Sequence, residues 1–337
     1  MSVPTPLQSF LGGIGLSLPV FALVKLNGSV FGISGFLHRA VRGGREALMA
    51  VAGLVLGGIV IGLVEGEGPQ TLSTSLAKLA FSGFLVGMGT RLGNGCTSGH
   101  MICGLSRFSL RSLAATATFF STAVITTYLV HPGELPPVAP MDWTLGPIGK
   151  VLLALQLIPL AIETGLYVFA PEPQPEPHAN DKATEETDPN TTSTLPLTSL
   201  RLLASAATSL NFALALRLSN LTEPSRVIAF LALPFHQGFD PSLAFLAMGA
   251  LPTSIILYQY CRGSELPRLG GPWSIPGCGL VDTRLILGAA TFGIGWGLEG
   301  ICPGPGLVNI GRAVVTGSHI PQLALWVSAV VAGGLVV

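Results

Sequence analysis

The sequence predicts an all-α integral membrane protein with about nine transmembrane helices in two related halves. Hydrophobic residues make up 49% of the 337-residue chain and charged residues only 10%, with a mean hydropathy of +0.63. Soluble domains average about 25% charged residues. A glycine-rich motif with a cysteine also occurs twice, which is typical of repeat-built membrane proteins. The net charge of zero gives no indication of nucleic-acid binding, so no nucleic-acid partner is expected.

Nine segments of about 20 mainly apolar residues are long enough to span a bilayer. They are 7–26, 45–64, 73–92, 108–130, 149–170, 199–218, 241–260, 283–298 and 320–337. The eighth is short and glycine-rich, and Glu299–Gly306 is expected to continue it as a broken helix. Between the first two spans, Gly28–Arg45 (GSVFGISGFLHRAVRGGR) is too short and too polar to cross. A re-entrant element is favoured there over an amphipathic loop helix.

Residues 171–197 are predicted to form a disordered linker. They contain six prolines, six acidic residues, one lysine and no aromatic residue, and such a composition cannot bury enough apolar surface to order itself. The linker separates a first repeat at 1–148, with re-entrant GISG and CTSGH elements, from a second repeat at 198–337, with a re-entrant CPGP element. The span at 149–170 has no counterpart in the second repeat.

The glycine-rich motif relates the two halves. It runs from Gly87 to Arg111 (GMGTRLGNGCTSGHMICGLSRFSLR) and returns around residue 300 as GIGWGLEGICPGPG. At a shift of 206 residues, Gly87 aligns with Gly293 and Cys96 with Cys302. Equivalent spans are then separated by five crossings, an odd number, so the two repeats are expected to face opposite ways in the membrane. Such an inverted repeat is typical of transporter cores.

The orientation follows from Lys and Arg in short loops, which favour the cytosolic side. Arginines follow the first, third and seventh spans, whereas only acidic residues follow the second. The N-terminus is therefore expected outside and the C-terminus in the cytosol, with the plasma membrane as the predicted location. The first residues lack the basic region of a signal peptide, so no cleaved leader is expected.

The two motifs are expected to bind an anion. Short helices near His100–Leu110 and Leu307–Val315 should begin at the glycine breaks and aim their N-termini inward, where helix N-termini favour negative charge. Arg91, at the edge of the first break, would add a full positive charge. The residues predicted to contact a passing substrate are Arg91, Cys96, Thr97, Ser98, Gly99, His100, Cys103, Cys302 and Gly304.

Cysteine is the informative residue at the breaks. A thiol is a weak, polarisable hydrogen-bond donor, which suits a soft sulfur-bearing anion that must be bound briefly and released. Cys96 and Cys302 occupy equivalent places in the two motifs, and Cys103, seven residues after Cys96, would extend the same path. The other two of the five cysteines, Cys261 and Cys278, flank one loop and are expected to have no role in the site.

A metal site is an alternative interpretation of the first motif. Cys96, His100 and Cys103 would share one face of a continuous helix and would suit zinc or copper. Gly95 and Gly99 disfavour a continuous helix, and the second motif lacks counterparts of His100 and Cys103. No metal and no cofactor are therefore expected.

Glu163, Glu299 and Lys78 are charged residues within or next to predicted spans whose roles need separate interpretation. Glu163 lies in the unpaired fifth span, where an interhelical hydrogen bond is favoured over a functional role. Glu299 lies three residues before Cys302 and is open to three interpretations: neutral, pointing away, or a proton carrier. Lys78 is expected to extend its amine to the membrane interface.

The strings NGCTSGHMICGLSRFSLRSLAAT and FGIGWGLEGICPGPGL resemble the two signatures of the YeeE/YedE family of sulfur-transport membrane proteins, and the resemblance extends through both halves. It implies an hourglass-shaped bundle of nine spans, with short helices that dip to a central constriction. It also implies thiosulfate uptake with non-covalent handling of the ion by cysteines, which by motif are Cys96 and Cys302. Bacterial members carry a further cysteine near the first Gly-Ile-Ser-Gly, and this chain has none before Cys96.

The expected function is a permease, not an enzyme, for thiosulfate or a related small sulfur anion. One alternative is a membrane sulfurtransferase that forms a persulfide on Cys96 or Cys302. Others are a transporter of a selenium species or of another sulfur species, and a sensor subunit that binds without transport. The expected partners are the anion and the lipid bilayer, with a cytosolic sulfur-handling protein as a further candidate.

Overall fold

A computed structural model describes residues 3–70, 75–131, 133, 135, 137–173, 196–234, 236–263, 265–277 and 279–337. Over these residues the regular secondary structure consists of helices and includes no β-strand. The all-α class predicted from the sequence is therefore confirmed. Most of the predicted linker, residues 174–195, and Cys278 lie outside the described residues.

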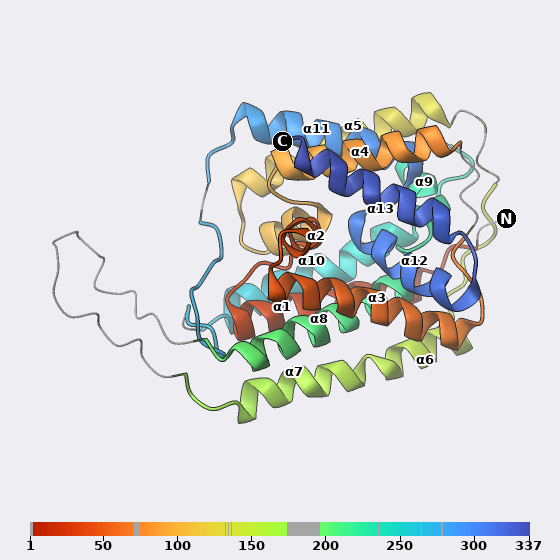
Figure 1. The fold of residues 1–337 in the computed structure, drawn as a ribbon. Helices are drawn as coiled ribbons and strands as arrows, with labels where there is room; N and C mark the ends of the chain where they lie inside the picture. The colour runs from red at the N-terminus through yellow and green to blue at the C-terminus, as the bar shows by residue number, and fades with distance from the viewer. Residues whose placement is uncertain are drawn as a thin grey trace.

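Every predicted span corresponds to a helix or a pair of helices, and Figure 1 shows the long helices running side by side. They are α1 (Pro6–Asn27), α3 (Arg45–Glu65), α4 (Leu76–Leu92), α5 (Leu110–Val130), the pair α6 (Pro147–Leu155) and α7 (Leu157–Phe169), α8 (Thr198–Leu218), α10 (Ser242–Cys261), α11 (Thr283–Glu299) and α13 (Ile320–Leu335). Seven helical stretches among the described residues are long and apolar enough to cross a membrane. With 17 and 16 residues, α4 and α13 are shorter, so nine crossings stay a prediction.

Four short helices lie between the long ones: α2 (Ile33–Val41), η1 (Ser98–Gly104), α9 (Pro224–Leu231) and α12 (Pro303–Thr316). The helices after the two breaks begin earlier than the sequence suggested, at Ser98 and Pro303. Proline suits the first position of a helix because its fixed φ is helical and its missing N–H would have no partner there. The CPGP string therefore opens α12 instead of lying before it.

Helix packing is reciprocal between the halves. Helix α1 packs on α10, and their counterparts in the opposite halves, α8 and α3, also pack on each other. In the same way α4 packs on α13, and their counterparts, α11 and α5, pack on each other. Glycines allow backbones to approach closely at these contacts. A Cβ added at Gly13 of α1 would lie 2.2 Å from the Leu246 carbonyl oxygen of α10, and one at Gly53 of α3 would lie 2.4 Å from the Ala206 carbonyl oxygen of α8.

The fifth predicted span, formed by α6 and α7, packs against α8 and α1. Asn211 of α8 donates a hydrogen bond from Nδ2 to Oε1 of Glu163, at 3.1 Å. Glu163 is 3% exposed, so this bond satisfies part of a carboxyl that would otherwise be costly to bury. The interhelical hydrogen bond predicted for Glu163 is confirmed.

A buried cluster of four charged side chains joins α3, α8, α9 and α12. Arg217 pairs with Glu65 and, at 2.6 Å, with Glu223. Arg312 of α12 pairs with the same two carboxylates, at 2.8 Å from Glu65 and 3.1 Å from Glu223. The cluster contains equal numbers of positive and negative groups, so its burial leaves no uncompensated charge.

The predicted topology can be tested by cysteine labelling in a background without the native cysteines. In that background a cysteine at residue 67 should react with an impermeant reagent from outside, and cysteines at residues 43 and 180 only after the membrane is permeabilised. Gly43 has a φ of +85°, where a side chain is strained, so the neighbouring Arg42→Cys (φ −90°) is the better variant. Reaction of positions 42 and 67 from the same side would remove a crossing and the inversion with it.

Candidate functional site

The two glycine-rich breaks meet inside the bundle. Helix α4 ends at Leu92, and the segment from Gly93 leads to the buried Cys96, which is 2% exposed. Helix α11 is capped by Gly300 in the left-handed conformation (φ +68°), and Cys302, 4% exposed, occupies the N-cap of α12. Thr97 Oγ1 donates to Cys302 Sγ at 3.8 Å. A residue beside the first cysteine thus contacts the second, 205 positions away.

Around this contact lies a cavity of about 270 Å³, here called the cysteine chamber. Its polar lining comes from Cys96, Thr97, Ser98 and Cys302, and Gly304 also lines it. The other lining residues are apolar, apart from backbone atoms and the indole N–H of Trp296: Leu16, Ile33, Met101, Ile102, Phe120, Phe212, Leu216, Leu221, Phe230, Leu243, Leu246, Ala247, Ala250, Leu251, Trp296, Pro303 and Pro305. None of the described lining residues carries a charge.

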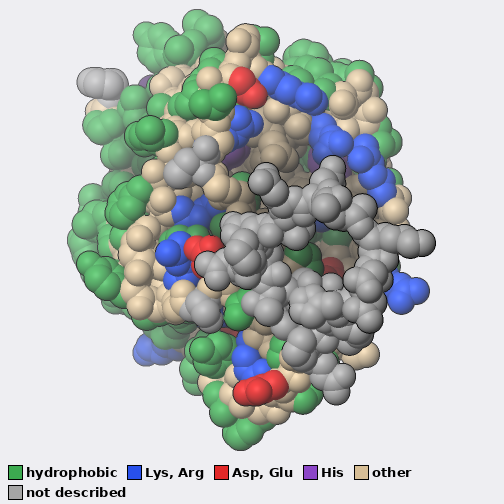
Figure 2. All heavy atoms as spheres, turned by 90° about the vertical axis from the view of Figure 1, so that its left-hand side faces the viewer, with side chains coloured by type: hydrophobic (Ala, Val, Ile, Leu, Met, Phe, Trp, Pro, Cys, Tyr) green, Lys and Arg blue, Asp and Glu red, His purple; other side chains and the backbone are tan. Residues whose placement is uncertain are grey.

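A larger cavity of about 550 Å³, here called the basic chamber, lies at the end of the molecule seen in Figure 2, where Lys and Arg side chains gather around a hollow. Six arginines line it: Arg39, Arg42, Arg91, Arg107, Arg111 and Arg201. Its one acidic lining residue among those described, Glu46, is paired with Arg201 at 2.7 Å. His38, Gly99 and His100 also line it. The chamber is therefore strongly electropositive.

Two short segments separate the chambers: residues 95–99 of the first motif and the start of α2. Gly95 and Gly99 line the basic chamber, whereas Cys96 and Ser98, which lie between them in the sequence, line the cysteine chamber. Ile33 at the start of α2 donates its backbone N–H to Ser98 Oγ at 3.4 Å. Ser98 Oγ also lies 3.4 Å from Cys96 Sγ. Neighbouring residues of one segment thus line the two chambers, and Ser98 connects this segment to the start of α2.

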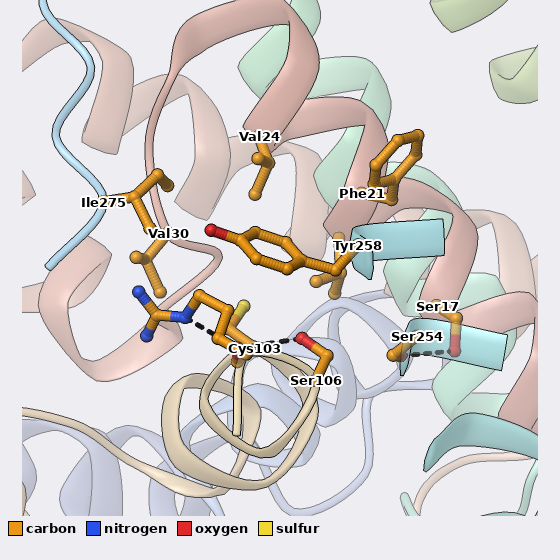
Figure 3. Close-up of a pocket in the computed structure, with 11 residues that line it drawn as sticks. Ser17, Phe21, Val24, Val30, Cys103, Ser106, Ser254, Tyr258 and Ile275 are labelled. Carbon is orange, nitrogen blue, oxygen red and sulfur yellow. Dashed lines mark hydrogen bonds between the residues drawn. The ribbon is translucent and has the colours of Figure 1, made fainter. Parts of the chain in front are cut away.

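His100 and Cys103 do not share the surroundings of Cys96. His100 is fixed by Ser112 Oγ, 3.2 Å from Nδ1, and by the Gly93 carbonyl oxygen, 3.3 Å from Nε2. Cys103 Sγ donates to the Phe31 carbonyl oxygen at 3.9 Å and lines a third cavity of about 20 Å³ (Figure 3). That volume is enough for about one water molecule.

The first motif therefore directs its side chains to three different cavities. One reason is that η1 is a π-helix, whose wider turn changes the angular spacing that an α-helix would give. Among the described residues, no group of three or more His, Cys, Asp and Glu side chains is placed to bind a metal. Cys261 is exposed and free.

Charged groups near the site include some that sequence reasoning did not identify. Arg39, Arg42, Arg107 and Arg111 served in the sequence only as indicators of orientation, although their concentration in alternate loops was a usable signal, and Arg201 was not considered. Glu299, 5% exposed, lies 3.8 Å from Nζ of Lys78. No sequence signal connects these two residues, because they lie on different halves of the chain.

Comparisons with known proteins agree with a transporter. A family model described as "Sulphur transport" matches residues 6–125, and a "Family of unknown function (DUF6691)" matches residues 200–337. A "Probable transporter" of Xylella fastidiosa strain Temecula1 is 43% identical over 119 residues, which are 34% of this chain and 88% of the relative. A second "Probable transporter" of that strain is 32% identical over 137 residues, 41% of this chain and 88% of the relative. No solved structure matches this chain.

Proposed function

This chain belongs to the YeeE/YedE family of sulphur-transport membrane proteins, and we propose that it is a permease for thiosulfate or a closely related sulfur anion. The observation that carries the proposal is the pair of buried cysteines, Cys96 and Cys302, in one chamber beside a strongly basic one. The anion is not transformed along this path.

The two chambers have different tasks in this proposal. The basic chamber concentrates anions, because six arginines face a single, already paired carboxylate. In the cysteine chamber the anion loses water and meets the thiols of Cys96 and Cys302 and the hydroxyls of Thr97 and Ser98. These neutral donors bind weakly enough to release the anion. Thiosulfate suits them because its terminal sulfur is large and polarisable.

The inverted repeat is part of the same proposal. The reciprocal packing of α1 with α10 and of α8 with α3 supports two equivalent halves. The match of separate family models to residues 6–125 and 200–337 agrees with a division of the chain into two parts. In the predicted orientation the basic chamber faces the cytosol, since it is built from the loops that follow the first, third and seventh spans.

A sulfurtransferase has less support from the geometry. A persulfide needs an activated thiolate, which forms beside a cation or a basic group. The hydrogen-bonding neighbours of the two thiols are hydroxyls: Ser98 for Cys96 and Thr97 for Cys302. Hydroxyls can donate hydrogen bonds to a passing anion, but they are too weakly basic to deprotonate a thiol.

Uptake into proteoliposomes tests the proposal. Purified protein should catalyse entry and counterflow of thiosulfate labelled on its terminal sulfur, and the labelled anion should be recovered unchanged. Liposomes with Cys96→Ser/Cys302→Ser protein serve as the matched control. Release of sulfite, with label left on the protein, would replace the permease by a sulfurtransferase. Binding without counterflow would indicate a sensor subunit.

A further inference from the structure

The side chain of His38 is buried in the basic chamber without a hydrogen-bond partner. It belongs to α2, a nine-residue helix, and is 8% exposed. Neither Nδ1 nor Nε2 has a partner among the described residues. Arg91, which lines the same chamber from α4, has a buried Nε that also lacks one. Buried polar nitrogens are nearly always hydrogen-bonded, so three unpaired ones on two residues that line one cavity are suited to pair with a bound ligand.

Packing alone does not account for the imidazole. The ring rests on Gly334 of α13, where an added Cβ would lie 1.9 Å from His38 Cε1. Its three nearest neighbours would all be atoms of this ring. Glycine at 334 therefore makes room for the imidazole ring. A smaller apolar side chain at position 38 would fill this space without leaving nitrogens unpaired.

The charges that surround His38 are mainly positive. Helix α4 contributes Arg91, and Arg42 follows α2 itself, while the Arg39 guanidinium lies over the Phe36 ring at 5.4 Å. The carboxylate that α3 presents to the chamber, Glu46, is paired with Arg201. Of the other helices that pack on α2, α13 contains no ionisable side chain, and α12 contains only Arg312, which is paired with Glu65 and Glu223.

These surroundings disfavour protonation of the His38 ring when no anion is bound. Burial, and after it the charges of Arg91 and Arg42, lowers the pKa of His38 below its usual 6.5. At neutral pH the empty site thus holds a neutral imidazole, with one donor and one acceptor nitrogen. An anion can use only the donor. Its negative charge would offset the arginines and favour a protonated ring with two donors.

We propose that His38 and Arg91 form a subsite for a small, multiply charged oxyanion or thio-oxyanion, and that His38 takes up one proton from solution when the anion binds. This inference rests on the proposed function, since it assigns the resting place of the transported anion in the basic chamber. No covalent bond changes. The bound anion and proton together carry one negative charge less than the anion alone. Binding of thiosulfate therefore raises the affinity of His38 for a proton, and protonation of His38 raises the affinity for thiosulfate.

The test measures binding and proton uptake by the full chain purified in detergent. Sodium thiosulfate is titrated into weakly buffered protein, with calorimetry for affinity and a pH indicator for protons. The wild type should take up as much as one proton per anion, and its affinity should rise as the pH is lowered toward the pKa of the empty site. His38→Gln keeps a donor but cannot titrate, so its binding should show no proton uptake and no pH dependence.

Two further variants and one control make the assignment specific. Arg91→Gln should weaken thiosulfate binding about tenfold to a hundredfold, as expected for the loss of a charged hydrogen bond. Gly334→Ala should reproduce the loss of proton uptake, because it displaces the His38 ring without altering His38. His236→Gln removes a histidine that does not line the basic chamber and should behave as wild type. Thermal unfolding checks that each variant is folded.

Proton uptake that persists in His38→Gln, or unchanged binding in Arg91→Gln, would overturn the inference. So would the absence of thiosulfate binding to the wild type. If these variants bind and titrate as the wild type does while proteoliposomes still transport, the inference fails and the permease stands. If the wild type binds with proton uptake but shows no counterflow, the subsite stands and the permease fails.

Discussion

Replacing Cys96 or Cys302 with serine should remove most thiosulfate uptake while the protein still folds and reaches the membrane. Serine keeps a donor of similar size but lacks the polarisable sulfur that, in the proposed function, contacts the terminal sulfur of thiosulfate. Both residues are nearly inaccessible and line the cysteine chamber from opposite halves of the chain. We expect a loss of at least about tenfold in the initial rate, equivalent to about 1.4 kcal/mol in the barrier.

The remaining cysteines provide the controls. Cys261→Ser should be nearly silent because the residue is exposed and free, and the same is predicted for Cys278→Ser. Cys103→Ser should fall in between, since Cys103 bonds to Phe31 next to the segment that separates the chambers. Equal losses in all of these variants would indicate a general thiol requirement. Normal uptake by Cys96→Ser would exclude the proposed role of that sulfur.

Sequence reasoning identified the spans and both breaks because these features are local. Hydrophobic length predicts a span, and glycine or proline predicts a break, without reference to distant residues. The repeated motif added one long-range statement, that Cys96 and Cys302 are equivalent, and the contact of Thr97 with Cys302 agrees with it. The start of α12 was misplaced because the proline of a CPGP string was interpreted as part of the break and not as the first helical residue.

The electrostatic features were less predictable because they depend on how distant segments pack. Arg39, Arg107 and Arg201 come from three separate parts of the chain and meet only in the folded basic chamber. His38 was not singled out in the sequence, because its packing against α13 depends on Gly334, nearly 300 positions later. The pairing of Lys78 with Glu299 was not predicted, because the two residues lie in different halves of the chain.

Replacing Arg312 with methionine is expected to have the largest effect on stability. The side chain is 2% exposed and pairs with both Glu65 and Glu223. Its loss would leave two buried carboxylates to share Arg217. Removal of one partner from a buried ion pair typically costs about 3–5 kcal/mol, because the remaining charge is neither solvated nor compensated. Thermal unfolding in detergent should show a correspondingly large fall in Tm.

Two comparisons separate this effect from the loss of any arginine. Arg262→Met breaks a pair with Glu265 whose side chains are 39% and 55% exposed, so it should cost only about 0–1 kcal/mol. Adding Glu65→Gln to Arg312→Met leaves one buried acid, Glu223, and one buried base, Arg217, which pair with each other. The double variant should therefore recover part of the stability, because the effects of substitutions within one network are not additive. If Arg312→Met is no worse than Arg262→Met, the four charges do not act as a unit.

The cluster also links stability to transport, because Arg312 lies on the helix that begins at Cys302. Helix α12 is fixed at its start by the contact of Cys302 with Thr97 and farther along by Glu65 and Glu223. A variant that loosens only the second attachment should therefore reduce thiosulfate uptake even at temperatures where the protein remains folded. In the Glu65→Gln/Arg312→Met double variant, recovery of Tm without recovery of uptake would show that the cluster positions Cys302 in addition to stabilising the fold.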